Sequence, residues 1–161
     1  MKCTFMKIEA LENVATKFIE SKVHLEISLN LFSELKGRNK YNSIIRKSVL
    51  PRKYGVYIWV NKDKEEVVYI GMAGKIKNNG KISDHPIAKR LTAPRYKNKL
   101  TGKWIQTNDF INNFMLKDKM NILQISILYI KDNIPPSYLE SLLLYKYYQK
   151  NKKLPKLNCE F

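Results

Sequence analysis

Two short runs of β-branched and aromatic residues, separated by a charged segment, most constrain the fold of this chain. Residues 54–60 read Tyr-Gly-Val-Tyr-Ile-Trp-Val, and residues 66–71 read Glu-Val-Val-Tyr-Ile-Gly. Such residues favour strands, and a polar segment between two such runs is typical of a hairpin. We therefore predict an antiparallel pair of strands that places Tyr57 and Tyr69 on adjacent strands, where side chains come close together.

Hydrophobic spacing and helix-capping signals predict the remaining elements. We expect helices over 7–22, 41–49, 86–93, 108–116 and 135–150. We expect a buried strand over 121–130 and a strand, or alternatively a helix, over 23–32. We expect loops over 36–40, 73–84 and 94–106, and an extended tail over 154–158. The resulting order, α(β)α followed by β-β-α-α-β-α, predicts an α+β fold with helices packed on a small sheet.

The chain is strongly basic. It has 30 Lys and Arg against 14 Asp and Glu, a net charge of +16, and residues 75–103 hold nine Lys or Arg and one acid, Asp84. A fold does not need this imbalance, which costs self-repulsion. A polyanionic partner explains it most simply, and nucleic acid is the first choice. An anionic membrane is the alternative, but no lipidation motif or long basic amphipathic helix supports it.

Cysteine usage and targeting signals bear on the compartment. Cys3 and Cys159 lie near opposite ends of the sequence, which does not suggest a disulfide framework or a zinc site. The first ten residues have no apolar core of a signal peptide, and no apolar stretch reaches the length of a membrane span. We therefore expect a protein of a reducing, bacterial-type cytoplasm with no membrane partner.

The tripeptides Gly-Val-Tyr (55–57) and Tyr-Ile-Gly (69–71) resemble the signature of the GIY-YIG nuclease superfamily. That family places an arginine on the helix after the second strand, a glutamate on a later helix and an asparagine near the end of the domain. This chain offers Arg90, Glu140 and Asn158 at corresponding places. The hairpin signature and these three residues occur in the family's order, and together they are a more specific match than any one of them alone.

The resemblance covers about residues 52–159. It implies a nuclease domain over 51–161, built as a small three-stranded sheet flanked by helices, with an N-terminal α(β) extension over 1–50. The extension would cover the sheet, form a dimer contact or touch DNA.

The family hydrolyses DNA phosphodiesters with a divalent metal, so the resemblance implies a DNA endonuclease that uses Mg²⁺ or Mn²⁺. The compact layout is most similar to the small type II restriction endonucleases of the family, which implies cleavage of double-stranded DNA at specific sites. Because each chain would cut one strand, a homodimer is expected for cutting both. A structure-selective repair or recombination nuclease and a catalytically inactive nucleic-acid-binding module are the alternatives.

The resemblance makes Glu140 the metal ligand and Arg90 the residue that holds the scissile phosphate. The helix around Glu140 is largely apolar, and a carboxylate in such surroundings needs a partner. Mg²⁺ suits it, since that ion commonly uses only one or two carboxylates. The alternative is a glutamate that stabilises a helix N-terminus. Arginine matches two phosphate oxygens with its planar fork, although Arg90 could also be a solvated surface cation.

The two tyrosines of the hairpin are the candidates for activating the attacking water. A free phenol has a pKa of about 10, so a nearby cation must lower it or the phenol must pass its proton onward. Tyr57 is preferred as the base, with Tyr69 orienting water or phosphate. The alternative is a pair of core aromatic residues in a chain with ten tyrosines.

Two positions depart from the family pattern and affect proton transfer. Met72 stands where some members carry a lysine, and Pro94 stands where many carry a His or Tyr. Lys75 would have to take the place of that lysine, and His85 or Tyr96 would have to take the place of the His or Tyr.

The remaining candidates support the site or contact DNA. Gly55 and Gly71 are expected to serve backbone geometry, and Asn158 to hydrogen-bond the backbone of the site or the metal shell. Basic residues are expected to contact phosphates, and amide or indole side chains to read bases. The phosphate contacts are Lys77, Lys81, Lys89, Arg95, Lys97, Lys99 and Lys103, and the possible base readers are Trp104, Gln106, Asn78 and Asn79.

Overall fold

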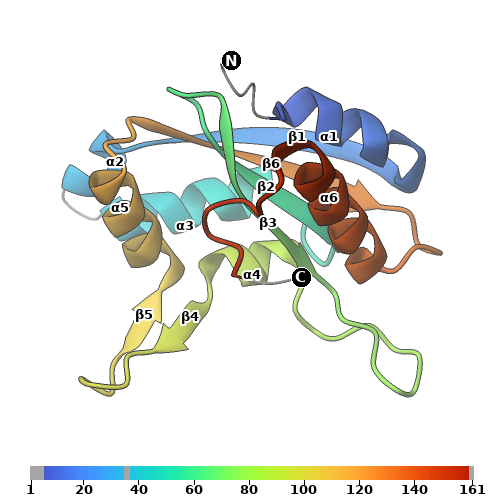
Figure 1. The fold of residues 1–161 in the computed structure, drawn as a ribbon. Coiled ribbons are helices and arrows are strands. Elements are labelled where there is room, and N and C mark those ends of the chain that lie inside the picture. The colour runs from blue at the N-terminus through green and yellow to red at the C-terminus, as the bar shows by residue number, and fades with distance from the viewer. Residues whose placement is uncertain (1–5, 35–36, 160–161) are drawn as a thin grey trace, which may run out of the picture.

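A four-stranded antiparallel sheet forms the middle layer of the molecule, with helices on both of its faces (Figure 1). The structure is a computed structural model, and it describes residues 6–34 and 37–159. Cys3 lies outside the described residues, whereas Cys159 is an exposed free thiol. No helix in the described part of the chain is long and apolar enough to cross a membrane.

The chain alternates between helices and strands, as expected for an α+β fold. The helices are α1 (Ile8–Ala15), α2 (Asn30–Ser33), α3 (Gly37–Ser48), α4 (Ile87–Thr92), α5 (Thr107–Lys117) and α6 (Pro136–Asn151), with a 3-10 turn at Thr16–Phe18. The strands are β1 (Ile19–Ser28), β2 (Gly55–Asn61), β3 (Glu66–Ala73), β4 (Pro94–Lys97), β5 (Trp104–Gln106) and β6 (Ile122–Ile130). The α+β class predicted from the sequence is confirmed.

The sheet has four strands rather than the expected three. Its order is β1-β6-β2-β3, and β1 pairs with β6 along almost its whole length, from Ile19 opposite Ile130 to Ser28 opposite Ile122. The additional strand comes from the first 50 residues. Pairing with β1 places β6 inside the sheet, which accounts for the nearly continuous burial of β6.

Element boundaries near the N-terminus differ from the prediction. The helix expected over 7–22 ends at Ala15, and the strand expected over 23–32 already begins at Ile19. The hydrogen bonds that β1 makes to β6 override the local helical spacing, because β propensity depends strongly on tertiary context. The loop expected over 36–40 is also wrong for residues 37–40, since α3 starts at Gly37, and Lys36 lies outside the described residues.

Each face of the sheet has its own apolar core. On one face, α1 and α6 bury side chains such as Leu11 and Leu143 against the sheet. On the other face, α3, α4 and α5 bury Tyr41, Leu91 and Ile111. The Tyr41 hydroxyl donates a hydrogen bond of 2.9 Å to the Leu91 carbonyl and so joins α3 to α4.

Two hairpins project from the same end of the molecule (Figure 1). The 74–84 hairpin is held by a β-bridge between Ile76 and Ile82. The second is the β4–β5 ribbon, residues 94–106, in which Tyr96 pairs with Ile105. The sequence predicted an irregular segment over 94–106, and this was wrong. Both strands are only three or four residues long, too short for a clear alternation of apolar and polar residues.

Candidate active site

The hairpin signature places its two tyrosines on the same face of the sheet. Tyr57 on β2 pairs with Gly71 on β3, and Trp59 pairs with Tyr69, so the two tyrosines are diagonal neighbours. Their ring centroids lie 6.0 Å apart. Tyr57 is only 3% exposed, whereas Tyr69 is half-buried. The two phenols therefore adjoin, but solvent reaches them unequally.

The glycines of the signature allow close approach. A Cβ atom on Gly71 would lie 2.7 Å from Cε1 of Tyr69 and 3.0 Å from the hydroxyl oxygen of Tyr57. A Cβ on Gly55 would lie 2.0 Å from the backbone oxygen of Leu128 on β6. Gly71 therefore provides room for the tyrosine pair, and Gly55 allows β2 and β6 to meet.

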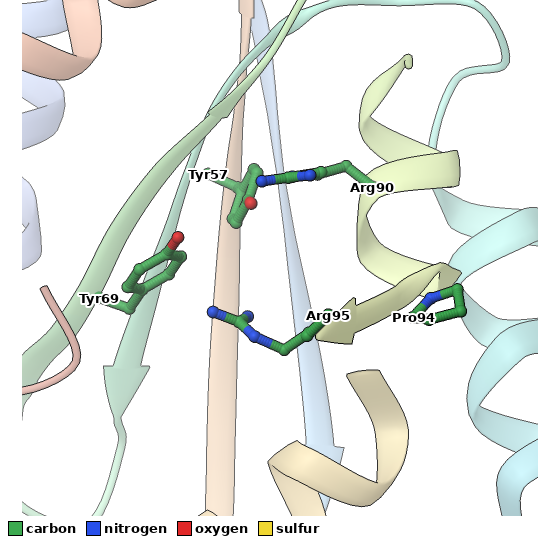
Figure 2. Close-up of a pocket in the computed structure, with 5 residues that line it drawn as sticks. All are labelled: Tyr57, Tyr69, Arg90, Pro94 and Arg95. Carbon is green, nitrogen blue, oxygen red and sulfur yellow. The ribbon is translucent and has the colours of Figure 1, made fainter. Parts of the chain in front are cut away.

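A pocket of about 60 Å³ opens in front of the tyrosines, larger than the roughly 10–15 Å³ that one buried water needs. Figure 2 shows its lining, in which Tyr57, Tyr69, Arg90 and Arg95 direct their polar ends toward a shared space; Pro94 also lines the pocket. We call this the tyrosine pocket. Its two guanidinium groups come from α4 and β4, so three parts of the fold meet here.

Arg95 is held by aromatic rings. Its Cζ atom lies 5.2 Å from the ring centroids of both Trp59 and Tyr69 and 4.4 Å from that of Phe110. Such stacking is a favourable environment for a guanidinium group. The sequence suggested Arg95 as one of several phosphate contacts on a loop. The structure places it in the tyrosine pocket, and no sequence signal indicated this, because the β4–β5 ribbon itself was not predicted.

Burial governs the ionisation of Tyr57. Desolvation, together with the neighbouring Tyr69, raises the pKa of Tyr57 well above its ordinary value. The positive charges of Arg90 and Arg95 and a hydrogen bond to Arg90 offset only part of this rise. Tyr57 is therefore a neutral phenol at neutral pH, which suits a hydrogen-bond donor better than a proton acceptor.

A second pocket adjoins the first through a shared arginine. It has a volume of about 190 Å³, and its lining includes Lys75, Ser83, His85 and Arg90. Because Arg90 lines both pockets, Lys75 and His85 are brought next to the tyrosine pocket. Tyr96, the alternative for their role, is half exposed on the ribbon and lines neither pocket.

Glu140 lies in the first turns of α6 and is half-buried. It does not line the tyrosine pocket itself. Burial raises the pKa of its carboxyl group, while the charges of Lys75 and Arg90 act in the opposite direction. The carboxylate is therefore within electrostatic reach of both cations, although it lines neither of the two pockets.

The donor set for a metal at this place is small. Within residues 6–34 and 37–159, no group of three or more His, Cys, Asp or Glu residues is arranged to hold an ion. A metal would depend on Glu140, completed by water and substrate oxygens. This fits Mg²⁺, which often binds proteins through one or two carboxylates, and it does not fit a structural zinc site.

Asn158 binds the backbone of the strand that carries Tyr69. Its Oδ1 atom accepts a hydrogen bond of 2.9 Å from the Ile70 N–H, and its Nδ2 group donates one of 2.8 Å to the Ile70 carbonyl. The Leu157 N–H also donates to the Val68 carbonyl, at 2.9 Å. Two roles were expected for Asn158, and the structure shows the first of them, hydrogen bonding to the backbone of the site.

The expected DNA contacts lie mostly on the two projecting hairpins, outside the tyrosine pocket. Lys89 differs from them, because its ammonium group donates to the Asp84 carbonyl at 3.0 Å. Among the possible base readers, Trp104 is 58% exposed, whereas Asn79 accepts a hydrogen bond from the Lys81 N–H within its own turn. Asn78 is exposed and Gln106 is half-buried. On the hairpins lie Lys77, Lys81, Lys97, Lys99 and Lys103.

The chain matches no known protein-family model, no curated protein and no solved structure at a significant level.

Proposed function

We propose that this protein is a metal-dependent phosphodiesterase that cleaves DNA. One observation carries the proposal: two tyrosines and two arginines share a pocket on the face of a rigid sheet, and a half-buried carboxylate lies within electrostatic reach of one of the arginines. A phosphodiester needs cationic groups for its developing charge and oxygen groups for the attacking water. The net charge of +16 supports a polyanionic substrate.

Arg90 is the proposed ligand of the scissile phosphate. It lines both pockets, so a phosphate beside it would have the tyrosines on one side and Lys75 and His85 on the other. A guanidinium group can donate two parallel hydrogen bonds to phosphate oxygens. Arg95 has less freedom because three rings surround it, and its proposed role is a fixed positive charge beside the pocket.

The two tyrosines take different roles. Tyr57, kept neutral by burial, donates its hydroxyl hydrogen and orients the attacking water or a phosphate oxygen. Tyr69 is the more accessible phenol: it takes the proton of that water as the water oxygen attacks phosphorus, and at the same time passes its own hydroxyl proton to solvent. This reverses the roles preferred from the sequence, because the burial of Tyr57 disfavours its phenolate.

Departure of the leaving group requires a proton. Lys75 and His85 line the second pocket beside Arg90. One of them supplies the proton to the alkoxide oxygen as its bond to phosphorus breaks.

Glu140 is the proposed ligand of a divalent ion, Mg²⁺ or Mn²⁺. A bound ion of this kind neutralises phosphate charge and polarises the phosphorus–oxygen bonds. Desolvation already disfavours the free carboxylate of Glu140, so a cation beside it removes an energetic cost.

The proposed substrate is double-stranded DNA, cut at specific sites as restriction endonucleases of the similar family do. Because one chain has one such site, cutting both strands would use a homodimer whose two-fold axis matches a palindromic target. Junction-specific cleavage, or DNA binding with no cleavage, are the outcomes that would replace this assignment.

The proposal is tested by incubating the protein with long unmethylated duplex DNA and with branched DNA, in Mg²⁺ and in EDTA. We expect discrete fragments from the duplex in Mg²⁺ only. Glu140→Ala should abolish them, whereas Glu9→Ala, at an exposed position on α1, should not. Calorimetric titration with Mn²⁺ should show binding to the parent protein and none to Glu140→Ala.

Each contrary outcome has a clear meaning. Cleavage that persists in EDTA or in Glu140→Ala would overturn the metal assignment. Cleavage of branched DNA alone would indicate a structure-selective nuclease. Metal-independent binding with no cleavage of either substrate would indicate a binding module.

A further inference from the structure

The β4–β5 ribbon carries only positive charge. Residues 94–106 contain one Arg, three Lys and neither Asp nor Glu. Among the residues that the structure describes, Lys97, Lys99 and Lys103 form no ion pair with a carboxylate. These three ammonium groups are exposed and available to an anionic partner.

The same ribbon exposes large apolar side chains. Tyr96 is 50% exposed, Trp104 58% and Leu100, at the tip, 96%. A single exposed apolar residue is ordinary. Five of the ten exposed large hydrophobic residues among those described lie on the two projecting hairpins, however, and three of the five are on this ribbon. Cations interleaved with exposed aromatic and aliphatic groups suit contact with both phosphates and bases.

The tip of the ribbon is preorganised by Asn98. Its side-chain oxygen accepts hydrogen bonds from the N–H groups of Leu100, at 2.9 Å, and Thr101, at 3.1 Å. Its backbone N–H donates to the Lys103 carbonyl, and its carbonyl accepts from the Gly102 N–H. Leu100 is thus displayed by an ordered turn, and ordering before binding lowers the entropic cost of association.

The base of the ribbon is fixed to the tyrosine pocket. Arg95 belongs to β4 and is stacked among the rings of Trp59, Tyr69 and Phe110. Directly after β5, at the first residue of α5, the Thr107 hydroxyl donates a hydrogen bond of 2.6 Å to the Ala93 carbonyl. Anything that the ribbon binds is therefore held at a set position relative to the pocket.

We propose that the β4–β5 ribbon enters the major groove of duplex DNA and selects the target sequence, an inference that rests on the proposed function. The major groove, about 12 Å wide, admits a two-stranded ribbon, whereas the minor groove, about 6 Å wide, is too narrow. From Pro94 to Leu100 the chain can extend roughly 20 Å at about 3.3 Å per residue, more than the groove depth of about 8.5 Å.

The side chains divide into two functions. Lys97, Lys99 and Lys103 contact phosphates along the groove and set the register of the ribbon. Trp104 and Leu100 lie against base edges and thymine methyl groups, where apolar contact discriminates between base pairs.

Tryptophan fluorescence provides a direct test. Trp59 is fully buried and Trp104 is 58% exposed, so acrylamide quenches mainly Trp104. With a saturating short duplex in EDTA, so that cleavage cannot occur, we expect the quenching to fall severalfold. A Trp104→Phe variant should lose this change and isolates the signal of Trp104. Trp104→Ala should weaken binding roughly tenfold or more, because it removes the apolar contact area of the indole ring.

The choice of groove is tested with modified duplexes. Bulky substituents at the 5-position of the pyrimidines, which project into the major groove, should weaken binding strongly. Netropsin, which occupies the minor groove, should leave it almost unchanged. The opposite result would overturn the assignment of the groove.

The outcomes separate this inference from the proposed function. Saturable binding with Trp104 still open to acrylamide would overturn the ribbon assignment and leave the nuclease proposal standing. Protection of Trp104 without cleavage of any DNA would retain the ribbon and overturn the nuclease. Absence of duplex binding at low salt would overturn both.

Discussion

At the scale of single residues, the unequal burial of the two tyrosines governs what each can do. Tyr57 is 3% exposed and its pKa is raised by desolvation, whereas Tyr69 is half-buried in the same pocket. A tyrosine that stays neutral contributes through hydrogen bonding. A tyrosine that accepts a proton must be reached by the water that it activates.

This difference predicts distinct effects of removing each hydroxyl. Tyr57→Phe should lower kcat about 10- to 100-fold and leave the shape of the pH–rate profile unchanged, because the raised pKa keeps Tyr57 neutral over the working range. Tyr69→Phe should lower kcat further, by about 10²–10⁴. Steady-state cleavage rates at several pH values would check this. If Tyr57→Phe lost a pH dependence that the parent protein and Tyr69→Phe both retain, the role of base would return to Tyr57.

Gly71 is the second residue with a specific expectation. A Cβ there would press on the rings of both tyrosines, at 2.7 and 3.0 Å. Overpacking of this kind costs about 1–3 kcal/mol, and small displacements of catalytic groups can cost about 100-fold in rate. We expect Gly71→Ala to lower kcat at least tenfold while the protein stays folded. Gly80→Ala on the 74–84 hairpin is the comparison variant: the space there is open and only the left-handed φ of +75° opposes a side chain, so it should strain that turn alone and retain activity.

At the scale of elements, a buried carboxylate fastens α1 to two strands. Glu12, 5% exposed, accepts hydrogen bonds from Lys22 (2.5 Å) on β1 and Ser126 (2.6 Å) on β6, and pairs with the His24 ring nitrogen at 2.7 Å. Burial alone would raise the pKa of Glu12, but these hydrogen bonds outweigh it and hold the pKa below its ordinary value of 4.5.

The lowered pKa gives stability a defined pH dependence. Because Glu12 ionises more readily when folded, its contribution is present above about pH 4.5 and is lost as the pH falls through the lower, folded-state pKa. Glu12→Gln should reduce the free energy of unfolding at pH 7 by about 1.5–3 kcal/mol, with a smaller loss in acid. Denaturant melts across this range would check it. Glu9→Gln, exposed on the same helix, should change little.

The C-terminal tail acts as a partner for the edge strand β3. Asn158→Ala would leave both the N–H and the carbonyl of Ile70 without their side-chain partner. We expect a loss of about 1–3 kcal/mol and faster hydrogen exchange of the Ile70 amide. The amide of Ile58 on the interior strand β2 serves as the internal control and should be unaffected. Unchanged exchange at Ile70 would contradict a supporting role for the tail.

At the scale of the whole molecule, charge and shape act together. Both basic hairpins project from one end, and the turn between β2 and β3 lies at the other end (Figure 1).

Binding of duplex DNA should weaken with salt, with a slope of log Kobs against log salt near −0.9 per phosphate contact. Replacing Lys97 and Lys103 with Gln should reduce this slope by about 1.8. Lys64→Gln, in the β2–β3 turn, should not alter it.

Anisotropy titrations at several salt concentrations would measure these slopes. A flat salt response of the parent protein would exclude a groove lined by cations. An equal change of slope in Lys64→Gln would show that the hairpins contribute no more than the general charge of the protein.

Local pattern was sufficient to predict some parts of the site and the fold. The β2–β3 hairpin, the buried strand β6 and the helix that begins at Pro136 follow from runs of apolar residues and from proline. Arg90 and Glu140 were selected through a resemblance, and their placement near each other required the folded chain. The place of Arg95 in the pocket was not predicted, because its stacking partners come from three separate elements, strand β2, strand β3 and helix α5.

The sequence by itself determined the α+β class, the hairpin that carries the two tyrosines and the basic character of the chain, because composition, short-range periodicity and turn chemistry are local properties. Only the tertiary structure decided that β1 completes a four-stranded sheet, that Tyr57 is buried while Tyr69 is accessible, and that residues 94–106 form an ordered ribbon anchored by Arg95. Those features depend on hydrogen bonds and packing between segments far apart in the chain, and desolvation of a side chain is set by all of its neighbours together.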